Sequence, residues 1–373
     1  MTEQREKIAV LGIGKLGICF ALNLERSGYD VVGVDVDENY VQAINSKTLK
    51  SYEPGVERYL QNSTHFKATT NINEAIDAET ALVFIMVATP SLPDGSYNHA
   101  QIEHVAERLM QFGKQQFKKH IIIGCTTMPG YCDTLAALLA PYNYTVSYNP
   151  EFIAQGNIIH DQQYPDQVLI GEADKETGDK IVEVYKKMCL NQPVYCRMNR
   201  LSAEICKLAT NCFLTMKISF ANSMGDFAIR AGADPDKILS AIGSDSRIGS
   251  KYIRYGFGFG GPCFSRDNRA LALSGKQHGM DLHLSYATDV VNKQHLDFQF
   301  KQYMEQYPSD EVISFDHVSY KKGSVILEES QQLALALRLA REGRKVLIKD
   351  VPAVVGAVKK LYGDLFLYEE SKD

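Results

Sequence analysis

Cys263 and Asp267 stand four residues apart at the end of the glycine-rich stretch "GFGFGGPCFSRD" (residues 256–267). A thiolate is an effective nucleophile when its surroundings hold its proton loosely or a base removes it. If the chain turns helical here, Asp267 shares a face with the thiol and can accept a proton or orient a water, and Arg266 adds a positive charge nearby. Glycine is costly to order, so we expect this loop to close around a sugar or phosphate. The alternative is that Cys263 is a small buried residue, as most free cysteines are.

Lys207 and Asn211 form a second pair with the same spacing, in a long segment of helical periodicity. Their side chains would emerge on one face of a helix. An ammonium and an amide on a mostly apolar helix can stabilise a developing oxyanion. A lysine that extends along the surface and keeps its charge in water explains the spacing equally well.

The first predicted strand runs into "VLGIGKLG", which places Gly12, Gly14 and Gly17 in G-x-G-x-x-G spacing. In this fingerprint the glycines make a tight turn, admit a pyrophosphate and let the helix pack on the sheet, and the helix N-terminus binds the anion. Asp35 ends the second predicted strand, where a carboxylate accepts the ribose hydroxyls and repels a 2′-phosphate, so NAD is expected rather than NADP. Asp37 is the alternative ribose partner, although it falls past the strand end.

The elements that must position these residues follow three patterns along the chain. Strands alternate with helices over 1–197, which predicts a Rossmann-type NAD-binding domain with a doubly wound parallel sheet. Long helices dominate 198–296, beginning with one over 200–232, and we expect a central domain that dimerises through that helix. The α/β alternation returns in 297–373, where we expect a small C-terminal domain. The predicted fold class is therefore α/β.

Composition excludes several classes of protein. With 45% hydrophobic and 23% charged residues and a net charge of -5, the chain has no basic footprint for nucleic acid or an anionic membrane. No apolar run reaches the length of a membrane span, and the N-terminus does not resemble a signal peptide. The eight cysteines form no CxxC pair, so we expect free thiols, a cytoplasmic protein and no metal site.

Beyond these local signals, the sequence resembles the UDP-glucose/GDP-mannose dehydrogenases from residue 7 to about 295. Several motifs at consistent separations carry the resemblance: "GIGKLG", "YEPGV", "VATP", "CTTMPG", "NPEFIAQG", "AEICKLATN", "DSRIGSKYI" and "GFGGPCFSRD". The resemblance implies an NAD-dependent four-electron oxidation of a sugar nucleotide's 6-hydroxyl to a carboxylate, through a thiohemiacetal and a thioester on Cys263.

The resemblance also implies roles for individual residues. The implied catalytic residues are Cys263, Lys207, Asn211, Asp267, Thr126 and Glu151. Lys207 and Asn211 would steady the oxyanion, and Asp267 would assist proton transfer. Thr126 and Glu151 match positions that hold the catalytic water and act in acid/base steps, although Thr126 at a helix start would also serve as a cap.

Further positions match the family's ligand contacts. Cofactor contacts are implied for Thr89, Thr126 and Gln155, and substrate contacts for Glu151, Phe152, Lys207, Asn211, Arg247, Tyr252, Arg254, Gly260 and Lys321. Arg247 matches an arginine that reaches the sugar nucleotide of a neighbouring subunit, which again implies a homodimer. Arg254 has the alternative role of a solvated surface charge.

Three departures from the family pattern bear on function. Gln155 replaces a glutamate, and an amide cannot act as a base. Ser265 and Arg266 replace the usual Pro-Lys before the aspartate. In the C-terminal stretch "YKKGSVILEES", Lys321 fits a family lysine but Glu328 falls where an arginine approaches the cofactor, and the domain is shorter than in relatives. A carboxylate there would repel a pyrophosphate.

The resulting prediction is an enzyme that converts UDP-glucose to UDP-glucuronate. GDP-mannose and a UDP-N-acetylhexosamine are the alternative substrates. Another alternative is a non-catalytic NAD-binding homologue that acts as a subunit or regulator. The reduced C-terminal domain is the observation that supports it. A two-electron hydroxyacid dehydrogenase shares the cofactor fold but has no need of Cys263.

Overall fold

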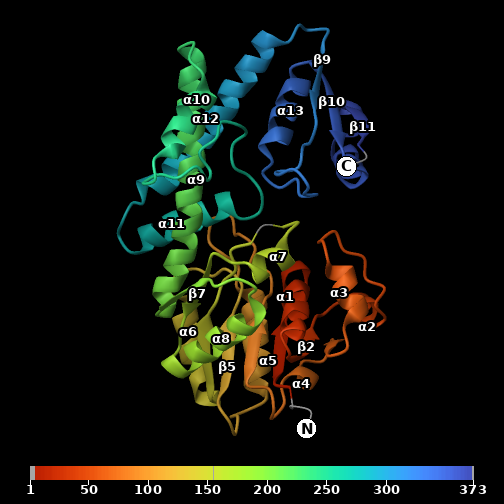
Figure 1. Ribbon diagram of the computed structural model, residues 1–373, viewed down its shortest axis with the longest axis vertical. Coiled ribbons are helices and arrows are strands. Elements are labelled where there is room, and N and C mark those ends of the chain that lie inside the picture. Colours follow the sequence, from red (N-terminus) through yellow and green to blue (C-terminus); the bar gives the residue numbers. More distant parts are fainter. Residues whose placement is uncertain (1–4, 154, 372–373) are drawn as a thin grey trace. The chain divides into compact units, whose positions relative to one another are not determined.

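The computed structural model describes residues 5–153 and 155–371. The chain divides into two compact units, Met1–Lys207 and Leu208–Asp373, which Figure 1 colours from red to yellow-green and from green to blue. The further boundary expected near residue 297 lies inside the second unit and stays a prediction.

The first unit is built on an eight-stranded sheet with the order β3-β2-β1-β4-β5-β6-β7-β8. Its strands are β1 (Lys7–Leu11), β2 (Asp30–Val34), β3 (Phe66–Thr69), β4 (Leu82–Ile85), β5 (Lys119–Ile123), β6 (Tyr144–Tyr148), β7 (Gln167–Gly171) and β8 (Val194–Met198). Strands β1 to β6 are parallel, in the order typical of a dinucleotide-binding domain. The predicted α/β doubly wound fold is confirmed.

Strand β7 departs from the parallel arrangement that we expected throughout. It runs antiparallel to β6, pairing only where Tyr148 meets Gly171, and β8 is parallel to β7. A parallel pair needs a crossover along the sheet, usually through a long helix. The described part of the connection between β6 and β7 contains the six-residue helix α7 (Ile158–Gln163), and β7 returns from it in the opposite direction.

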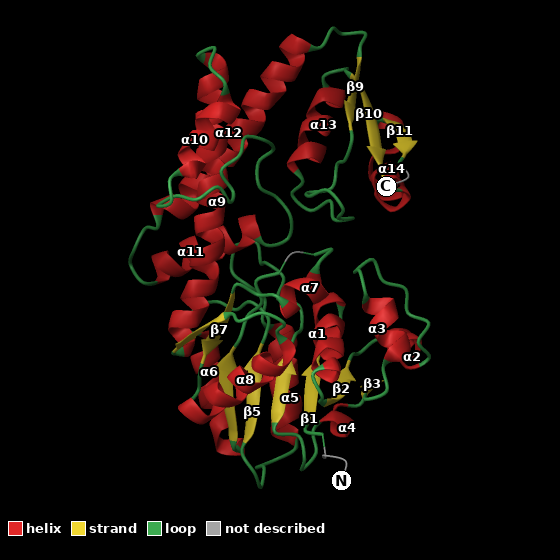
Figure 2. Cartoon of the chain, viewed as in Figure 1, coloured by secondary structure: helices red, strands yellow, loops and turns green. Residues whose placement is uncertain are grey.

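Helices cover both faces of this sheet (Figure 2). They are α1 (Lys15–Arg26), α2 (Glu38–Asn45), α3 (Val56–Asn62), α4 (Ile72–Ala75), α5 (Ala100–Gln111), α6 (Tyr131–Leu139), α7 and α8 (Lys175–Met188), with the short helix η1 (Ala140–Tyr142). Alternate residues of β1 enter two hydrophobic clusters: Ile8 and Val10 pack into one, Ala9 and Leu11 into the other. Strands β4 and β5 are buried along their whole length, as expected between two helical layers.

The predicted long helix is α9 (Arg200–Arg230), which begins in the first unit and ends in the second. The second unit continues with α10 (Pro235–Ser244), α11 (Phe264–Gln277), α12 (His283–Gln306), β9 (Val312–Phe315), α13 (Gln331–Arg341), β10 (Lys345–Asp350), α14 (Pro352–Tyr362), η2 (Gly363–Leu365) and β11 (Leu367–Glu370). Its three strands form a parallel sheet, in the order β11-β10-β9. Within the described part of the chain, no helix combines the length and apolarity needed to cross a membrane.

Side chains from α9 and α12 hold the glycine-rich loop that precedes α11. Asn222 accepts a hydrogen bond from Gly256 N–H at 3.1 Å and donates to the carbonyl of Phe257 at 3.3 Å. Asn292 pairs with both backbone groups of Phe259, accepting from its N–H at 2.9 Å and donating to its carbonyl at 2.8 Å. Since Phe259 is buried, these bonds replace water for the loop backbone.

We predict that Asn292→Ala lowers the free energy of unfolding by about 2–3 kcal/mol. The substitution leaves the buried backbone N–H and carbonyl of Phe259 without hydrogen-bond partners. Chemical denaturation measures the change. Gln294→Ala, an exposed position on the same helix, is the matched control and should change stability by less than about 0.5 kcal/mol. Equal effects from the two variants would contradict the anchoring role of Asn292.

Candidate active site

Three glycines between β1 and α1 form a cradle suited to a dinucleotide. Gly12 has a φ of +88°, and a Cβ there would lie 2.8 Å from the carbonyl oxygen of Met86. A Cβ on Gly17 would overlap with the carbonyl of Gly12, whereas one on Gly14, the residue before α1, would meet nothing within 4 Å. Turn, helix packing and open approach therefore fall on the three glycines as predicted, and the residues present fit NAD.

The two aspartates after β2 have different partners. Asp35 directly follows the strand, is partly buried, and accepts a hydrogen bond from Asp37 N–H at 3.3 Å. Asp37 is the N-cap of α2, and its Oδ1 accepts from Tyr40 N–H at 3.1 Å. Because Asp37 is engaged in capping a helix, Asp35 remains the better candidate for the ribose hydroxyls.

Glu204 was missed by the sequence analysis, yet its carboxylate holds the loop between β5 and α6. It is fully buried in α9 and accepts three hydrogen bonds, from Thr127 Oγ1 at 2.8 Å, Gly130 N–H at 2.7 Å and Cys132 N–H at 2.9 Å. Burial raises the pKa of Glu204, and these donors oppose the increase. A carboxylate on a mostly apolar helix, one turn before Lys207, was the available signal.

Thr126 lies in the loop that Glu204 holds. Its carbonyl accepts a hydrogen bond from the hydroxyl of buried Thr89 at 2.8 Å, so the two threonines predicted at the cofactor are in direct contact. The alternative role of Thr126 as a helix cap is wrong, because α6 begins at Tyr131 with Gly130 as its N-cap.

Lys207 is buried and directed at the segment that follows β6. Its Nζ donates to the backbone carbonyl of Glu151 at 2.6 Å and lies 4.3 Å from the ring centre of Phe152. The alternative of a lysine extended along the surface is therefore wrong. The predicted residues Lys207, Glu151 and Phe152 are thus brought together within the first unit.

The carboxyl group of Glu151 is poised between its two protonation states near neutral pH. Desolvation raises its pKa to about 7, against a hydrogen bond from Gln162 and the charge of Lys207, which both lower it. The residue as a whole is only partly buried, so it is the carboxyl group that the fold removes from water. A group with this pKa suits proton transfer at neutral pH.

Cys263 and Asp267 share the first turn of α11, as their spacing predicted. Cys263 occupies the N-cap position, and Asp267 N–H donates to its carbonyl at 2.8 Å. Asn211 Nδ2 donates to Asp267 Oδ2 at 2.6 Å, and Arg266 Nε lies 3.7 Å from the other carboxylate oxygen. Cys263 is exposed, whereas the other seven cysteines are buried or partly buried, and all eight are free thiols. Cys263 is thus accessible, and the buried Asp267 is held one helical turn further along α11 by Asn211.

The chain's own packing explains most glycines of this loop. A Cβ on Gly258 would overlap with Asn292, one on Gly260 would overlap with the carbonyl of Glu329, and one on Gly261 would lie 2.5 Å from the Tyr320 ring. Only at Gly256, among the loop's four, would a Cβ meet nothing within 4 Å. The expectation that these glycines close around a ligand is therefore not needed to explain them, and substrate contact at Gly260 stays a prediction.

Several predicted ligand contacts lie on the surface of the second unit. Arg247, Tyr252, Arg254 and Lys321 are exposed, and Arg247 Nη2 pairs with Asp245 at 2.6 Å. Glu328 also exposes its side chain, while its carbonyl accepts from Gly261 N–H at 3.0 Å. Gln155, in the first unit, is partly buried. The roles implied for these residues stay predictions.

The glycine turn, set in a sheet of this strand order, defines a dinucleotide-binding domain. Comparison with known families gives the finer assignment. Residues 6–189 match the NAD binding domain of the UDP-glucose/GDP-mannose dehydrogenase family, and residues 201–294 match its central domain. The chain belongs to the UDP-glucose/GDP-mannose dehydrogenase family, and it is an NAD-dependent oxidoreductase.

Relatives within the family differ in the sugar nucleotide that they are named for. The chain is 30% identical to a UDP-glucose 6-dehydrogenase of Pseudomonas aeruginosa, over 95% of this chain and 81% of the relative. It is 28% identical to a GDP-mannose 6-dehydrogenase of Azotobacter vinelandii, over 92% and 81%. A solved UDP-glucose dehydrogenase structure from Pyrobaculum islandicum has a TM-score of 0.89 at 29% identity, covering 99% of this chain and 87% of that one. The substrate is a nucleotide sugar, and identity alone does not select the sugar.

We predict that Gly14→Ala and Gly17→Ala weaken NAD binding for different reasons. Gly14→Ala adds a methyl group where the pyrophosphate must approach, so NAD affinity should fall at least tenfold, about 1.4 kcal/mol, with little change in melting temperature. Gly17→Ala forces α1 away from the turn and should lower the melting temperature by several degrees. Calorimetric titration and thermal melts measure the two effects. A Gly14→Ala protein that binds NAD normally would contradict the assignment of the cradle.

Proposed function

We propose that this chain is a UDP-glucose 6-dehydrogenase that carries out two successive oxidations at one site. The observation that carries the proposal is the exposed thiol of Cys263 at the start of α11, followed one turn later by a buried aspartate that Asn211 holds. A dehydrogenase that stopped at the aldehyde would need no nucleophile at this point. UDP-glucose is the first substrate to test, because a 30% identical relative and a 29% identical solved structure are named for it, and GDP-mannose, for which a 28% identical relative is named, is the second.

In the proposed reaction, NAD held at the turn of Gly12, Gly14 and Gly17 would supply the hydride acceptor for each oxidation. The first oxidation removes a hydride from the 6-carbon and the proton of its hydroxyl group, which leaves an aldehyde. The Cys263 thiolate forms a bond from Sγ to the aldehyde carbon, and the resulting oxyanion takes up a proton to give a thiohemiacetal. Loss of a hydride from that carbon and of the proton from its hydroxyl group leaves a thioester. Water then attacks the thioester carbon and the S–C bond breaks, which releases the carboxylate and a proton and restores the thiol. The complete reaction consumes two NAD and one water for each sugar nucleotide.

The protein's own groups have separate tasks in this scheme. Lys207, fixed by its 2.6 Å bond to the Glu151 carbonyl, would stabilise the oxyanion together with Asn211. Asp267 would accept the thiol proton or orient water. Glu151, whose pKa is raised to about 7, would exchange a proton with the water that cleaves the thioester.

The proposal predicts two NADH per UDP-glucose and a higher kcat/KM for UDP-glucose than for GDP-mannose or UDP-N-acetylhexosamines. Cys263→Ser should release the free acid roughly 10³-fold more slowly, because the covalent route is lost. Absorbance of NADH and chromatography of the product measure both. Cys196→Ser, at a partly buried thiol on β8, is the control and should retain activity. If the protein binds NAD but no sugar nucleotide yields NADH, the chain is an NAD-binding homologue without this chemistry.

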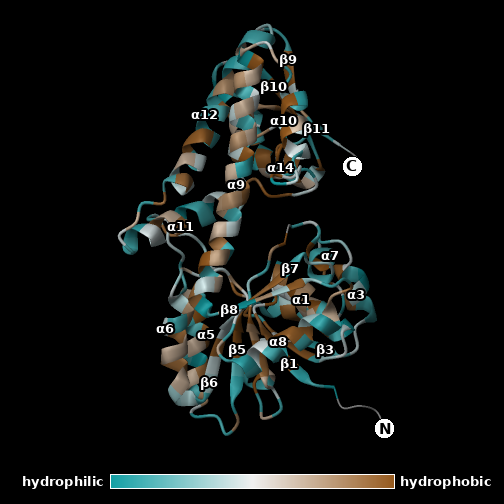
Figure 3. Cartoon of the chain, turned by 60° about the vertical axis from the view of Figure 1, so that its left-hand side comes forward, coloured by the Kyte–Doolittle hydropathy of each residue, from teal (hydrophilic) through white to brown (hydrophobic). Residues whose placement is uncertain are grey.

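We also propose that the protein is a homodimer that buries one face of α9. Phe213, Phe220 and Phe227 are spaced seven residues apart, or nearly two helical turns, and are 58%, 45% and 68% exposed. They therefore form a stripe along one side of the helix. Much of the α9 ribbon has colours from the hydrophobic half of the scale in Figure 3. Exposed aromatic rows of this kind mark protein interfaces, and a second copy of the helix offers a surface of the same chemistry.

We predict a dimer at micromolar concentration by light scattering, and a monomer for Phe220→Glu, because a carboxylate in the stripe would be desolvated without a partner. Gln111→Glu, which adds the same charge at an exposed position of α5, should leave the dimer intact. A monomeric wild-type protein would overturn the proposal.

A further inference from the structure

Three buried amide side chains in the first unit form a continuous hydrogen-bonded chain. Asn23 lies on α1 and Gln162 and Gln163 lie on α7, with exposed fractions of 1%, 3% and 6%. Buried amides are costly unless their donors and acceptors are paired. Here the pairing runs from the side of α1 to the carboxylate of Glu151.

A backbone carbonyl sets the direction of this chain. Asn23 Nδ2 donates to the carbonyl of Ile159 at 3.4 Å, and a carbonyl can only accept. The same Nδ2 donates to Gln162 Oε1 at 2.9 Å. Asn23 Oδ1 then faces the other way and accepts from Gln163 Nε2 at 2.7 Å. The flipped orientation of the Asn23 amide would place Oδ1 against the Ile159 carbonyl and Nδ2 against the Gln163 amide, so it would not satisfy these neighbours.

The orientation of Gln162 follows from that of Asn23. With Oε1 accepting from Asn23, the Nε2 group of Gln162 points to Glu151 and donates to its Oε2 at 3.0 Å. A donor in this position favours the charged carboxylate. The reversed amide would place its carbonyl oxygen against the carboxylate, where it would repel the charge.

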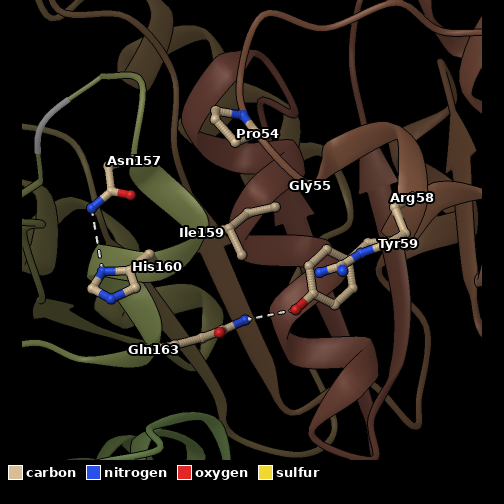
Figure 4. A pocket seen from close by; sticks show the side chains of 8 residues that line it. All are labelled: Pro54, Gly55, Arg58, Tyr59, Asn157, Ile159, His160 and Gln163. Atoms are coloured by element: carbon tan, nitrogen blue, oxygen red, sulfur yellow. Dashed lines mark hydrogen bonds between the residues drawn. The ribbon is translucent and has the colours of Figure 1, made fainter.

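The far end of the chain reaches the wall of a cavity. Gln163 Nε2 donates to the hydroxyl of Tyr59 at 3.3 Å, as Figure 4 shows. The cavity, of about 530 Å³, is lined by Pro54, Gly55, Arg58, Tyr59, Asn157, Ile159, His160 and Gln163. Hydrogen bonds to Tyr59 on α3 and to Glu151 in the segment after β6 thus hold the two ends of the amide chain.

Other titratable groups around Glu151 come from different elements. They are Lys207 on α9, Asp161 on α7, Cys19 on α1, Tyr185 on α8 and Cys189 just after it. Substituting Asn23 or Gln162 removes none of these five titratable side chains. A change in the pKa of Glu151 in such a variant can therefore be assigned to the amides and not to the loss of a neighbouring charge.

We propose that Asn23 is a positioning residue for the active site: it holds the Gln162 amide with its N–H directed at the Glu151 carboxylate. This inference rests on the proposed acid/base role of Glu151. The Asn23 amide bonds Ile159, Gln162 and Gln163, and it reaches the carboxylate through the Gln162 amide.

The test is a double-mutant cycle on the protonation of Glu151. Asn23→Leu keeps the volume but cannot orient Gln162, and Gln162→Met removes the amide that contacts the carboxylate. Each single variant should raise the pKa of Glu151 by about one pH unit, as expected for loss of a hydrogen bond to a charged group. The effect of Asn23→Leu should vanish in the Gln162→Met background.

Carbon-13 NMR titration of the glutamate carboxyls, with Glu151→Gln to assign the signal, measures the pKa whether or not the protein is active. In the active enzyme, the acidic limb of the kcat profile should move upward by the same amount, giving up to tenfold lower activity at pH 6 and unchanged activity at pH 9. If the wild-type protein is inactive, the proposed function is overturned. If Asn23→Leu still raises the pKa of Glu151 in that case, the positioning role of Asn23 stands.

The control is Asn45→Leu, which removes the amide that bonds both backbone groups of Ala68 in the same unit. It should lower stability without moving the pKa of Glu151. If Asn23→Leu does not fold, Asn23→Ser, whose hydroxyl is too short to reach Gln162, takes its place in the cycle. An unchanged pKa in the Asn23 variant, or an effect that persists in the Gln162→Met background, would overturn the proposal.

Discussion

Buried polar side chains along helix α9 hold the segments that carry the candidate catalytic groups. In the first unit, Glu204 binds the loop between β5 and α6, and Lys207 binds the backbone of Glu151. In the second unit, Asn211 holds Asp267 and Asn222 holds the backbone of the glycine loop. Each of these groups would be costly in an apolar interior without its partner. The helix and the segments therefore depend on one another.

Fold and local site geometry were predictable from the sequence because both rest on short-range periodicity. Four-residue spacing placed Cys263 beside Asp267 in one helical turn before any tertiary contact was known. The direction of β7 was not predictable in this way, since it depends on how the chain between β6 and β7 returns to the sheet. The structure also explains the glycines of the loop differently from the sequence, because Gly258 and Gly260 pack against Asn292 and Glu329.

Contacts between residues far apart in the chain could not be predicted from the sequence. The bond between Asn211 and Asp267 joins two motifs that had been identified separately. Glu204 lies inside a quoted motif, yet only the structure shows that its carboxylate accepts from two backbone N–H groups and the Thr127 hydroxyl. Asn23 and Gln162 belong to no recognised motif, and their importance depends on the direction of an amide, which no periodicity encodes.

The burial of Glu151 couples function to stability. Its pKa is raised from 4.5 to about 7 in the folded protein, so the native state binds a proton more tightly than the unfolded chain between those values. The stabilisation from this proton is complete below pH 4.5 and is lost as the pH rises through 7. An ionised Glu151 above pH 7 is thus less favourable to folding, which is the cost of keeping the proposed proton-transfer group out of water.

The central claim is that the exposed thiol of Cys263 becomes covalently bound to the sugar during turnover. The direct measurement is peptide mass spectrometry of the protein quenched in acid during reaction with UDP-glucose and NAD. We expect an added sugar-nucleotide mass on the peptide that contains Cys263, dependent on NAD and absent from the other seven cysteines. Rapid formation of two NADH with no adduct on Cys263, or with an adduct on another cysteine, would contradict it.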